Sequence, residues 1–168
     1  HRLDKDTSGC IIIAKSNDAL PSLVKQFHDR TTEKRYLTVV QSTPGKDKDS
    51  IFTHIGRHPV NRLKMAVTPT GKEAITHFVV LERYRAHTRI RCKLETGRTH
   101  QIRVHLSYIG YPLIGDLAYG GRVRFPKKAS QDLKGALGNF SRQALHSKKL
   151  TLIHPRTGEL MTWKIDLP

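Results

Sequence analysis

The amino-acid sequence predicts an α+β domain built on a mixed, largely antiparallel sheet. Two observations support this fold class. Long strand-like segments dominate the chain, with only two or three helical patterns among them. Residues 74–82 and 87–95 alternate or run apolar on either side of residues 83–86, which is typical of a hairpin of long strands. The chain has 168 residues, so we expect one domain with a sizeable core.

The first nine residues, His1 to Gly9, are predicted to form a functional loop. They precede Cys10 to Ala14, a short isoleucine-rich run that is predicted to be a buried strand. Loops that feed core strands often present functional side chains. This loop holds two carboxylates, those of Asp4 and Asp6, among three cations. A carboxylate beside arginine or lysine stays ionised and can act as a nucleophile, a base or an ion-pair partner. A charged, solvated turn is the alternative.

An amphipathic helix is predicted over residues 18–29. Its apolar residues recur at helical spacing and are Leu20, Leu23, Val24 and Phe27. After this helix, residues 34–40 are predicted to form a strand, and residues 42–50 an exposed loop.

A second helix is predicted after the strand hairpin, with Thr99 as its N-cap. Ile102, Leu106 and Ile109 would then lie on one face, and Gly110 would end the helix.

Two basic segments are predicted to be irregular, residues 56–64 and residues 115–128. The second contains Gly120-Gly121 and ends in a basic tail. Residues 145–153 and 160–166 are predicted to be the last two strands, around a turn at residues 155–158.

The charge of the chain points to a polyanionic partner. It contains 30 Lys and Arg residues against 14 Asp and Glu, a formal net charge of +16. Such an excess favours association with nucleic acid, and a generally basic soluble protein is the alternative. The apolar fraction of 37% and the charged fraction of 26% indicate a folded enzyme or binding domain rather than disorder.

The two cysteines, Cys10 and Cys92, lie in apolar strand-like contexts, so we expect reduced core thiols and a cytoplasmic protein. The sequence has neither a signal peptide nor an apolar run long enough to cross a bilayer. The chain begins without methionine inside the loop described above, and we expect it to be a fragment of a longer protein.

Several chemistries lack their sequence patterns. The ten histidines come without a Cys-x-x-Cys motif or a His pair at i and i+4 beside a carboxylate, so no metal site is predicted. Gly120-Gly121 lacks the spacing and the preceding strand of a phosphate-binding loop. No serine sits in a nucleophile elbow.

Three residues remain as candidates for chemistry: Asp4, Arg98 and Tyr36. Arg98 precedes the start of a predicted helix, where an anion is favoured, and an aspartate held by it would be an ionised nucleophile. Tyr36 follows Lys34 and Arg35, so its ring could stack on a base while the cations hold phosphate. Each has an ordinary alternative: Asp4 as a turn former, Arg98 as a phosphate ligand and Tyr36 as a packed strand residue.

The motifs resemble those of the RluA family of RNA pseudouridine synthases, and the resemblance covers essentially the whole chain. Four blocks occur in family order: His1 to Gly9, Lys34-Arg35-Tyr36, Leu94 to His105, and Pro112 to Asp116 with Tyr119-Gly120-Gly121. Three further segments look most like the RluD branch, which acts on large-subunit ribosomal RNA: Arg57-His58-Pro59, Met65-Ala66-Val67 and Arg122 to Ser130.

The resemblance implies a role for each matching residue. Asp4 corresponds to the catalytic aspartate, Tyr36 to the tyrosine that stacks on the target uracil, and Arg98 to an arginine that ion-pairs with Asp4. Arg2 resembles the arginine that enters the RNA stack when the uridine leaves it, and Leu106 an apolar wall of the pocket. Asp6 and Asp116 match structural positions. The remaining residues expected to contact RNA are Lys34, Arg122, Arg124 and Lys127.

The resemblance also implies a reaction and a fold. The bond between uracil N1 and ribose C1′ breaks, the base turns, and it rejoins the sugar through C5 without a cofactor. The expected fold is a mixed sheet with a central catalytic cleft, acting as a monomer on ribosomal RNA, with strands and any small RNA-binding domain upstream of the sequence missing. An RNA-binding module without chemistry is one alternative, and the pocket carboxylate speaks against it. A hydrolase of small substrates is the other, and the net charge speaks against it.

Overall fold

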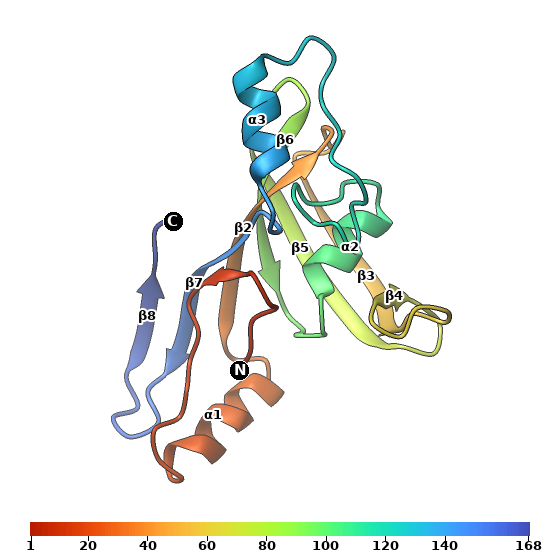
Figure 1. Ribbon diagram of the computed structural model, residues 1–168. Helices are drawn as coiled ribbons and strands as arrows, with labels where there is room; N and C mark the ends of the chain where they lie inside the picture. Colours follow the sequence, from red (N-terminus) through yellow and green to blue (C-terminus); the bar gives the residue numbers. More distant parts are fainter.

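One mixed sheet of eight strands organises the chain in the computed structural model, which describes residues 1–168 (Figure 1). The strands follow the order β1-β7-β2-β6-β5-β3-β4, and β8 also pairs with β7. Their bounds are β1 Ser8–Gly9, β2 Glu33–Gln41, β3 Lys48–Arg57, β4 Met65–Val67, β5 Lys72–Arg83, β6 His87–Leu94, β7 Leu145–Ile153 and β8 Leu160–Lys164. Only β1 and β7 are parallel, so the predicted α+β fold with a largely antiparallel sheet is confirmed.

Strand β2 lies at the centre of this sheet because it can bury every second side chain. Its residues alternate between half-buried and buried, with Lys34, Tyr36, Thr38 and Val40 on the buried face. It pairs with β6 without interruption from Lys34 opposite Leu94 to Gln41 opposite His87. The predicted strand at residues 34–40 and the predicted β5–β6 hairpin are therefore confirmed.

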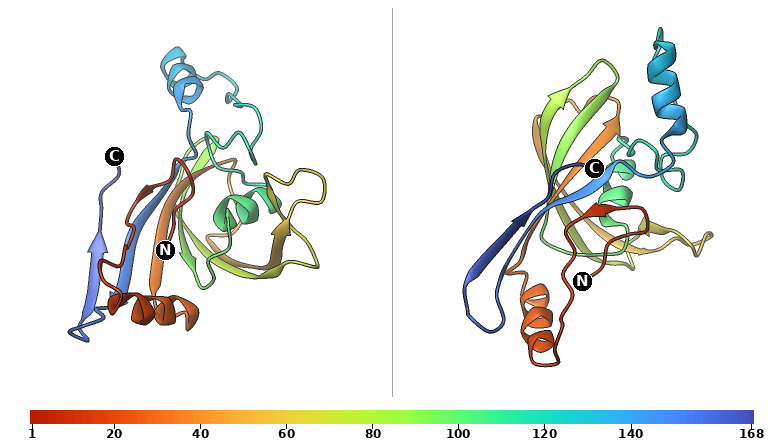
Figure 2. Two further views of the ribbon diagram at one scale, coloured as in Figure 1. Left: turned by 60° about the horizontal axis from the view of Figure 1, so that its bottom comes forward. Right: turned by 60° about the vertical axis from the view of Figure 1, so that its left-hand side comes forward.

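Three helices accompany the sheet: α1 (Ala19–His28), α2 (Gln101–Tyr108) and α3 (Gln131–Asn139). Helix α2 packs on one face of the sheet, against β4 and β5, and residues 101–106 of it are buried. Helices α1 and α3 lie at opposite ends of the molecule in all three views (Figures 1 and 2). No helix is long and apolar enough to cross a membrane.

The predicted strand over Cys10 to Ala14 is wrong. The segment is not part of the sheet, and the strand at this place is the two-residue β1 before it. Cys10 is buried, whereas Ile11 and Ile13 are exposed to 51% and 72%. Strand β8 pairs with Lys149 to Ile153 of β7, so the edge of β7 beyond Gly9 is already occupied and the apolar run has no partner strand.

The other differences concern boundaries and one helix. Strand β3 begins at Lys48 and ends at Arg57, so it takes the ends of the two predicted loops at 42–50 and 56–64. Thr99 is not the N-cap of α2, because His100 occupies that position with a left-handed φ of 58°. Helix α3 was not predicted, since two of its nine residues are glycines, which weaken the helical signal. The final strands and the irregular residues 115–128 agree with the prediction.

The core has two main parts that meet along β2 and β7. The larger lies under α2 and contains Tyr36, Val40, Ile90 and Leu106. The smaller lies under α1 and contains Leu23 and Leu150 among its members. Both cysteines are buried and unpaired, as expected.

Candidate active site

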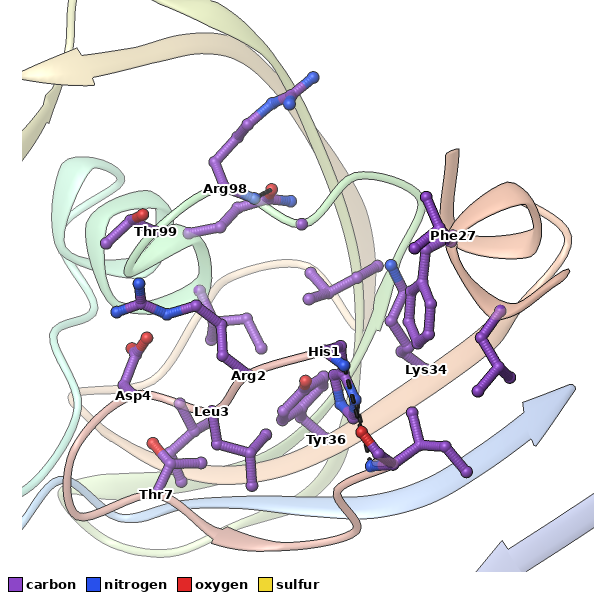
Figure 3. A pocket seen from close by; sticks show the side chains of 18 of the residues that line it. His1, Arg2, Leu3, Asp4, Thr7, Phe27, Lys34, Tyr36, Arg98 and Thr99 are labelled. Atoms are coloured by element: carbon purple, nitrogen blue, oxygen red, sulfur yellow. Dashed lines mark hydrogen bonds between the residues drawn. The ribbon is translucent and has the colours of Figure 1, made fainter. Parts of the chain in front are cut away.

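A cavity of about 450 Å³ opens between the N-terminal loop, α1, β2 and the turn before α2 (Figure 3). Its size is that of ligand pockets in proteins, about 300–1,000 Å³. The lining is mainly apolar at the α1 end and polar at the end near Asp4. Five of the residues singled out from the sequence line it: Arg2, Asp4, Lys34, Tyr36 and Arg98.

The loop that presents Asp4 is held by backbone geometry. The amide of Thr7 donates to the carbonyl of Asp4 over 3.0 Å, which closes a turn. Gly9, with φ of +110°, then lets β1 lie against β7, since a Cβ there would come within 2.3 Å of the carbonyl oxygen of Ser147. The side chain of Gln143 adds hydrogen bonds to the carbonyl of Lys5 and the hydroxyl of Thr7. The carboxylate of Asp4 is thereby fixed at the cavity, with 17% of its side chain exposed.

Arg103 is the arginine that pairs with Asp4. Its Nη1 lies 3.5 Å from Oδ2 of Asp4. The same guanidinium donates through Nε and Nη2 to both carboxylate oxygens of Asp116, over 2.7 and 3.0 Å. Burial opposes the charge of Arg103, but the hydrogen bonds and charge of Asp116 and the charge of Asp4 outweigh it, so the pKa of Arg103 is raised. Asp116 thus orients the guanidinium that keeps Asp4 ionised.

The predicted ion pair between Arg98 and Asp4 is not formed. Arg98 donates from Nε to the carbonyl of Glu73 over 2.8 Å, and Figure 3 shows its side chain pointing away from Asp4. The reason is the start of α2: Arg98 lies in the turn before the helix, whereas Arg103 lies within it on the side of the loop. Sequence reasoning missed Arg103, although it belongs to the same motif, because two arginines five residues apart offer no local signal that separates their roles.

A histidine and a tyrosine close the polar end of the site. Tyr119 accepts a hydrogen bond from the amide of Met65 over 2.9 Å, so its hydroxyl donates to Nδ1 of His100 at 2.7 Å. Burial lowers the pKa of His100, with Arg103 and Arg2 adding to it while Asp4 and Asp116 oppose. His100 is therefore neutral at physiological pH with its proton on Nε2.

Tyr36 contributes a buried ring to the floor of the cavity. It is 7% exposed, and burial raises the pKa of its phenol to about 12, so the hydroxyl stays protonated at neutral pH. Arg2 lies on the opposite side, and Figure 3 shows its side chain pointing toward Asp4. These two side chains bracket the space beside the carboxylate.

The other predicted contacts lie elsewhere. Leu106 is not a wall of the cavity: it is fully buried in the core, and Ile102, one turn earlier on α2, lines the cavity instead. Arg122, Arg124 and Lys127 are exposed in the irregular stretch that leads to α3. Arg85 from the β5–β6 turn donates to the carbonyl of Lys127 and holds this stretch in place.

The fold and the Asp4–Arg103 pair define a carboxylate-centred site on a strongly basic α+β domain. The sequence model of the family described as RNA pseudouridylate synthase matches residues 1–108, so the chain belongs to that family. The resemblance drawn from the motifs is thereby confirmed.

Known proteins similar to this chain have the same family name. It is 54% identical to "Ribosomal large subunit pseudouridine synthase D" of Pseudomonas aeruginosa and 49% identical to the protein of that name from Pasteurella multocida. Each comparison covers 100% of this chain and 52% of the relative, so the chain spans about half their length. The structure of "Human RNA Pseudouridylate Synthase Domain Containing 1" matches with a TM-score of 0.81 at 28% identity, covering 100% of this chain and 68% of the human one.

Proposed function

We propose that this protein isomerises uridine to pseudouridine in RNA, with large-subunit ribosomal RNA as the substrate. The observation that carries the proposal is the Asp4 carboxylate, held beside Arg103 at the polar end of an apolar cavity. The family supplies the reaction class, and the names of the relatives from Pseudomonas aeruginosa and Pasteurella multocida supply the RNA.

In the proposed reaction Asp4 is the catalytic carboxylate. The bond from uracil N1 to ribose C1′ breaks, the base turns, a bond from C5 to C1′ forms, and the C5 proton moves to N1 through the active site. Arg103 keeps the carboxylate ionised while RNA closes the cavity and excludes water. The product has the atoms of the substrate, so the step needs no cofactor.

Tyr36 and Arg2 serve the base rather than the bond-breaking step. A target uridine must leave its stack to reach a buried carboxylate, at a cost of about a few kcal/mol. The ring of Tyr36 offers a stacking surface inside the cavity, and its protonated hydroxyl adds no charge there. Arg2, which is exposed at the mouth of the cavity, takes the place that the base leaves in the RNA.

The wider surface supplies affinity. We propose that Arg122, Arg124 and Lys127 bind RNA phosphates outside the cavity, where their exposure leaves them free to do so. The protein would act as a monomer in the cytoplasm, where ribosomal RNA is available, with the rest of the protein extending the sheet and the RNA surface.

The test is Asp4→Asn in the intact protein, assayed for pseudouridine formation on a ribosomal RNA transcript. The amide is a far poorer nucleophile and cannot act as a base, so turnover should be lost while RNA binding persists. Asp6→Asn is a matched control, because it makes the same change two residues away, at an exposed position whose φ of 67° asparagine tolerates. Turnover by Asp4→Asn within tenfold of wild type would contradict the assignment.

A further inference from the structure

Lys34 occupies a position in the sheet that usually holds an apolar residue. It lies on the buried face of β2, two residues before Tyr36, so both side chains point to the same side of the sheet. Its side chain lines the cavity, and the residue is only 6% exposed. The ammonium makes no hydrogen bond and no salt bridge. Its one favourable contact is with the ring of Phe27, whose centroid is 5.7 Å away (Figure 3).

Further cations surround Lys34. The pKa of Lys34 is lowered first by burial and then by the charges of Arg30 and Arg98. Arg98 uses only Nε, on the carbonyl of Glu73, and its two terminal nitrogens have no partner. Arg30 pairs with the carboxylate of Glu73 over 2.7 Å at the exposed rim. Three cations thus share one carboxylate.

A buried ammonium without a counter-ion disfavours the free protein, and a bound anion would relieve the cost. Arginine offers the paired donors that fit phosphate oxygens, and lysine offers a point charge. The cavity continues from this cluster to Tyr36 and Asp4, so one ligand can reach both ends. That ligand needs an anionic group at one end and a planar base at the other, which describes a nucleotide within a strand.

We propose that Lys34 and Arg98, with Arg30 at the rim, form a binding site for one RNA phosphodiester next to the target uridine. This inference rests on the proposed function for the identity of the anion. It makes Arg98 a substrate-binding residue that fixes the backbone of the RNA, while Arg103 serves the carboxylate.

The first experiment uses inorganic phosphate and does not depend on the reaction. The melting temperature of the intact protein is measured in chloride and in phosphate at equal ionic strength, for wild type, Lys34→Met and the control Lys93→Met. Lys93 is exposed on the other face of β6. Lys34→Met should raise the melting temperature in chloride, because it removes an unpaired buried charge, and should lose the extra stabilisation by phosphate that wild type and Lys93→Met retain. A lower melting temperature in chloride with the phosphate effect intact would overturn the site and make Lys34 a structural residue.

The second experiment identifies the phosphate in RNA. Binding of a ribosomal RNA fragment that contains a modified uridine is measured in the Asp4→Asn background, with single linkages near that uridine replaced by neutral methylphosphonate. At one linkage the replacement should weaken binding about fivefold or more, and Lys34→Met should add no further loss there. Losses that add at every linkage would overturn the proposal. If phosphate stabilises the protein through Lys34 while no uridine is ever converted, the anion site stands and the proposed function fails.

Discussion

Nη1 of Arg103 lies 3.5 Å from Oδ2 of Asp4, while the rest of the same guanidinium is hydrogen-bonded to Asp116. The arginine is 8% exposed, and Asp116 is 3% exposed. The geometry therefore separates two duties: Asp116 fixes the guanidinium in two-point contact, and the remaining nitrogen faces Asp4. Asp4 is left with one partner and an open side toward the cavity.

Arg103→Lys should lower the single-turnover rate at saturating RNA on the order of 100-fold. Lysine cannot hold Asp116 at two points and face Asp4 at the same time. The acidic limb of the rate should also move to higher pH, because the Asp4 carboxylate loses the cation that favours its ionised form. The measurement is the single-turnover rate of pseudouridine formation from pH 5 to 9.

Arg156→Lys, on the exposed turn before β8, is the matched control for this prediction and should behave as wild type. Arg98→Met should instead raise the RNA concentration needed for half-saturation and leave the pH profile in place. A wild-type rate and profile for Arg103→Lys would remove Arg103 from the catalytic group.

Charge reversal at Arg122 and Lys127 tests the wider RNA surface. Both side chains are exposed and outside the cavity, so the double variant Arg122→Glu, Lys127→Glu should weaken binding to all RNA sequences alike. The slope of log affinity against log salt should become shallower by about one for each phosphate that the variant no longer binds. Filter binding at several salt concentrations measures both effects. Lys164→Glu on β8 is the control, and an unchanged slope in the double variant would contradict these contacts.

The sequence was sufficient for most of the sheet because the relevant patterns are local. Strand β2 alternates cleanly, and β5 and β6 form adjacent long strands, so both could be identified residue by residue. The run from Cys10 to Ala14 has equally strong apolar character. Its failure to form a strand depends on β8, more than 140 residues away, which occupies the edge it would need.

The site followed the same division between local and distant information. The motif placed Asp4, Tyr36 and Arg98 on one cavity, and all three line it. Which arginine faces the carboxylate depends on where α2 begins, and the left-handed conformation of His100 shifts that start past Thr99. The role of Asp116 depends on the same helix, since it becomes visible only once Arg103 is placed beside it.

The last prediction concerns His105, which is fully buried between α2 and the sheet. Its ring nitrogens form hydrogen bonds with the hydroxyls of Thr53 and Thr76, over 2.8 and 2.9 Å. Burial lowers the pKa of His105 to about 4 from an ordinary value of 6.5. The unfolded chain therefore binds a proton between pH 6.5 and pH 4 that the folded chain does not, and stability falls as the pH falls through this window.

The expected size follows from about 1.4 kcal/mol for each pKa unit, which gives up to about 3 kcal/mol in total and about 2 kcal/mol between pH 7 and pH 5. Urea unfolding of the intact protein at these two pH values measures the difference. His105→Leu should be less stable at pH 7, because two threonine hydroxyls lose a partner, but its free energy of unfolding should depend less on pH by about 2 kcal/mol. His54→Leu, at an exposed position of β3, is the control and should keep the wild-type pH dependence. Equal losses of stability in wild type and His105→Leu would show that this histidine does not couple the fold of α2 to pH.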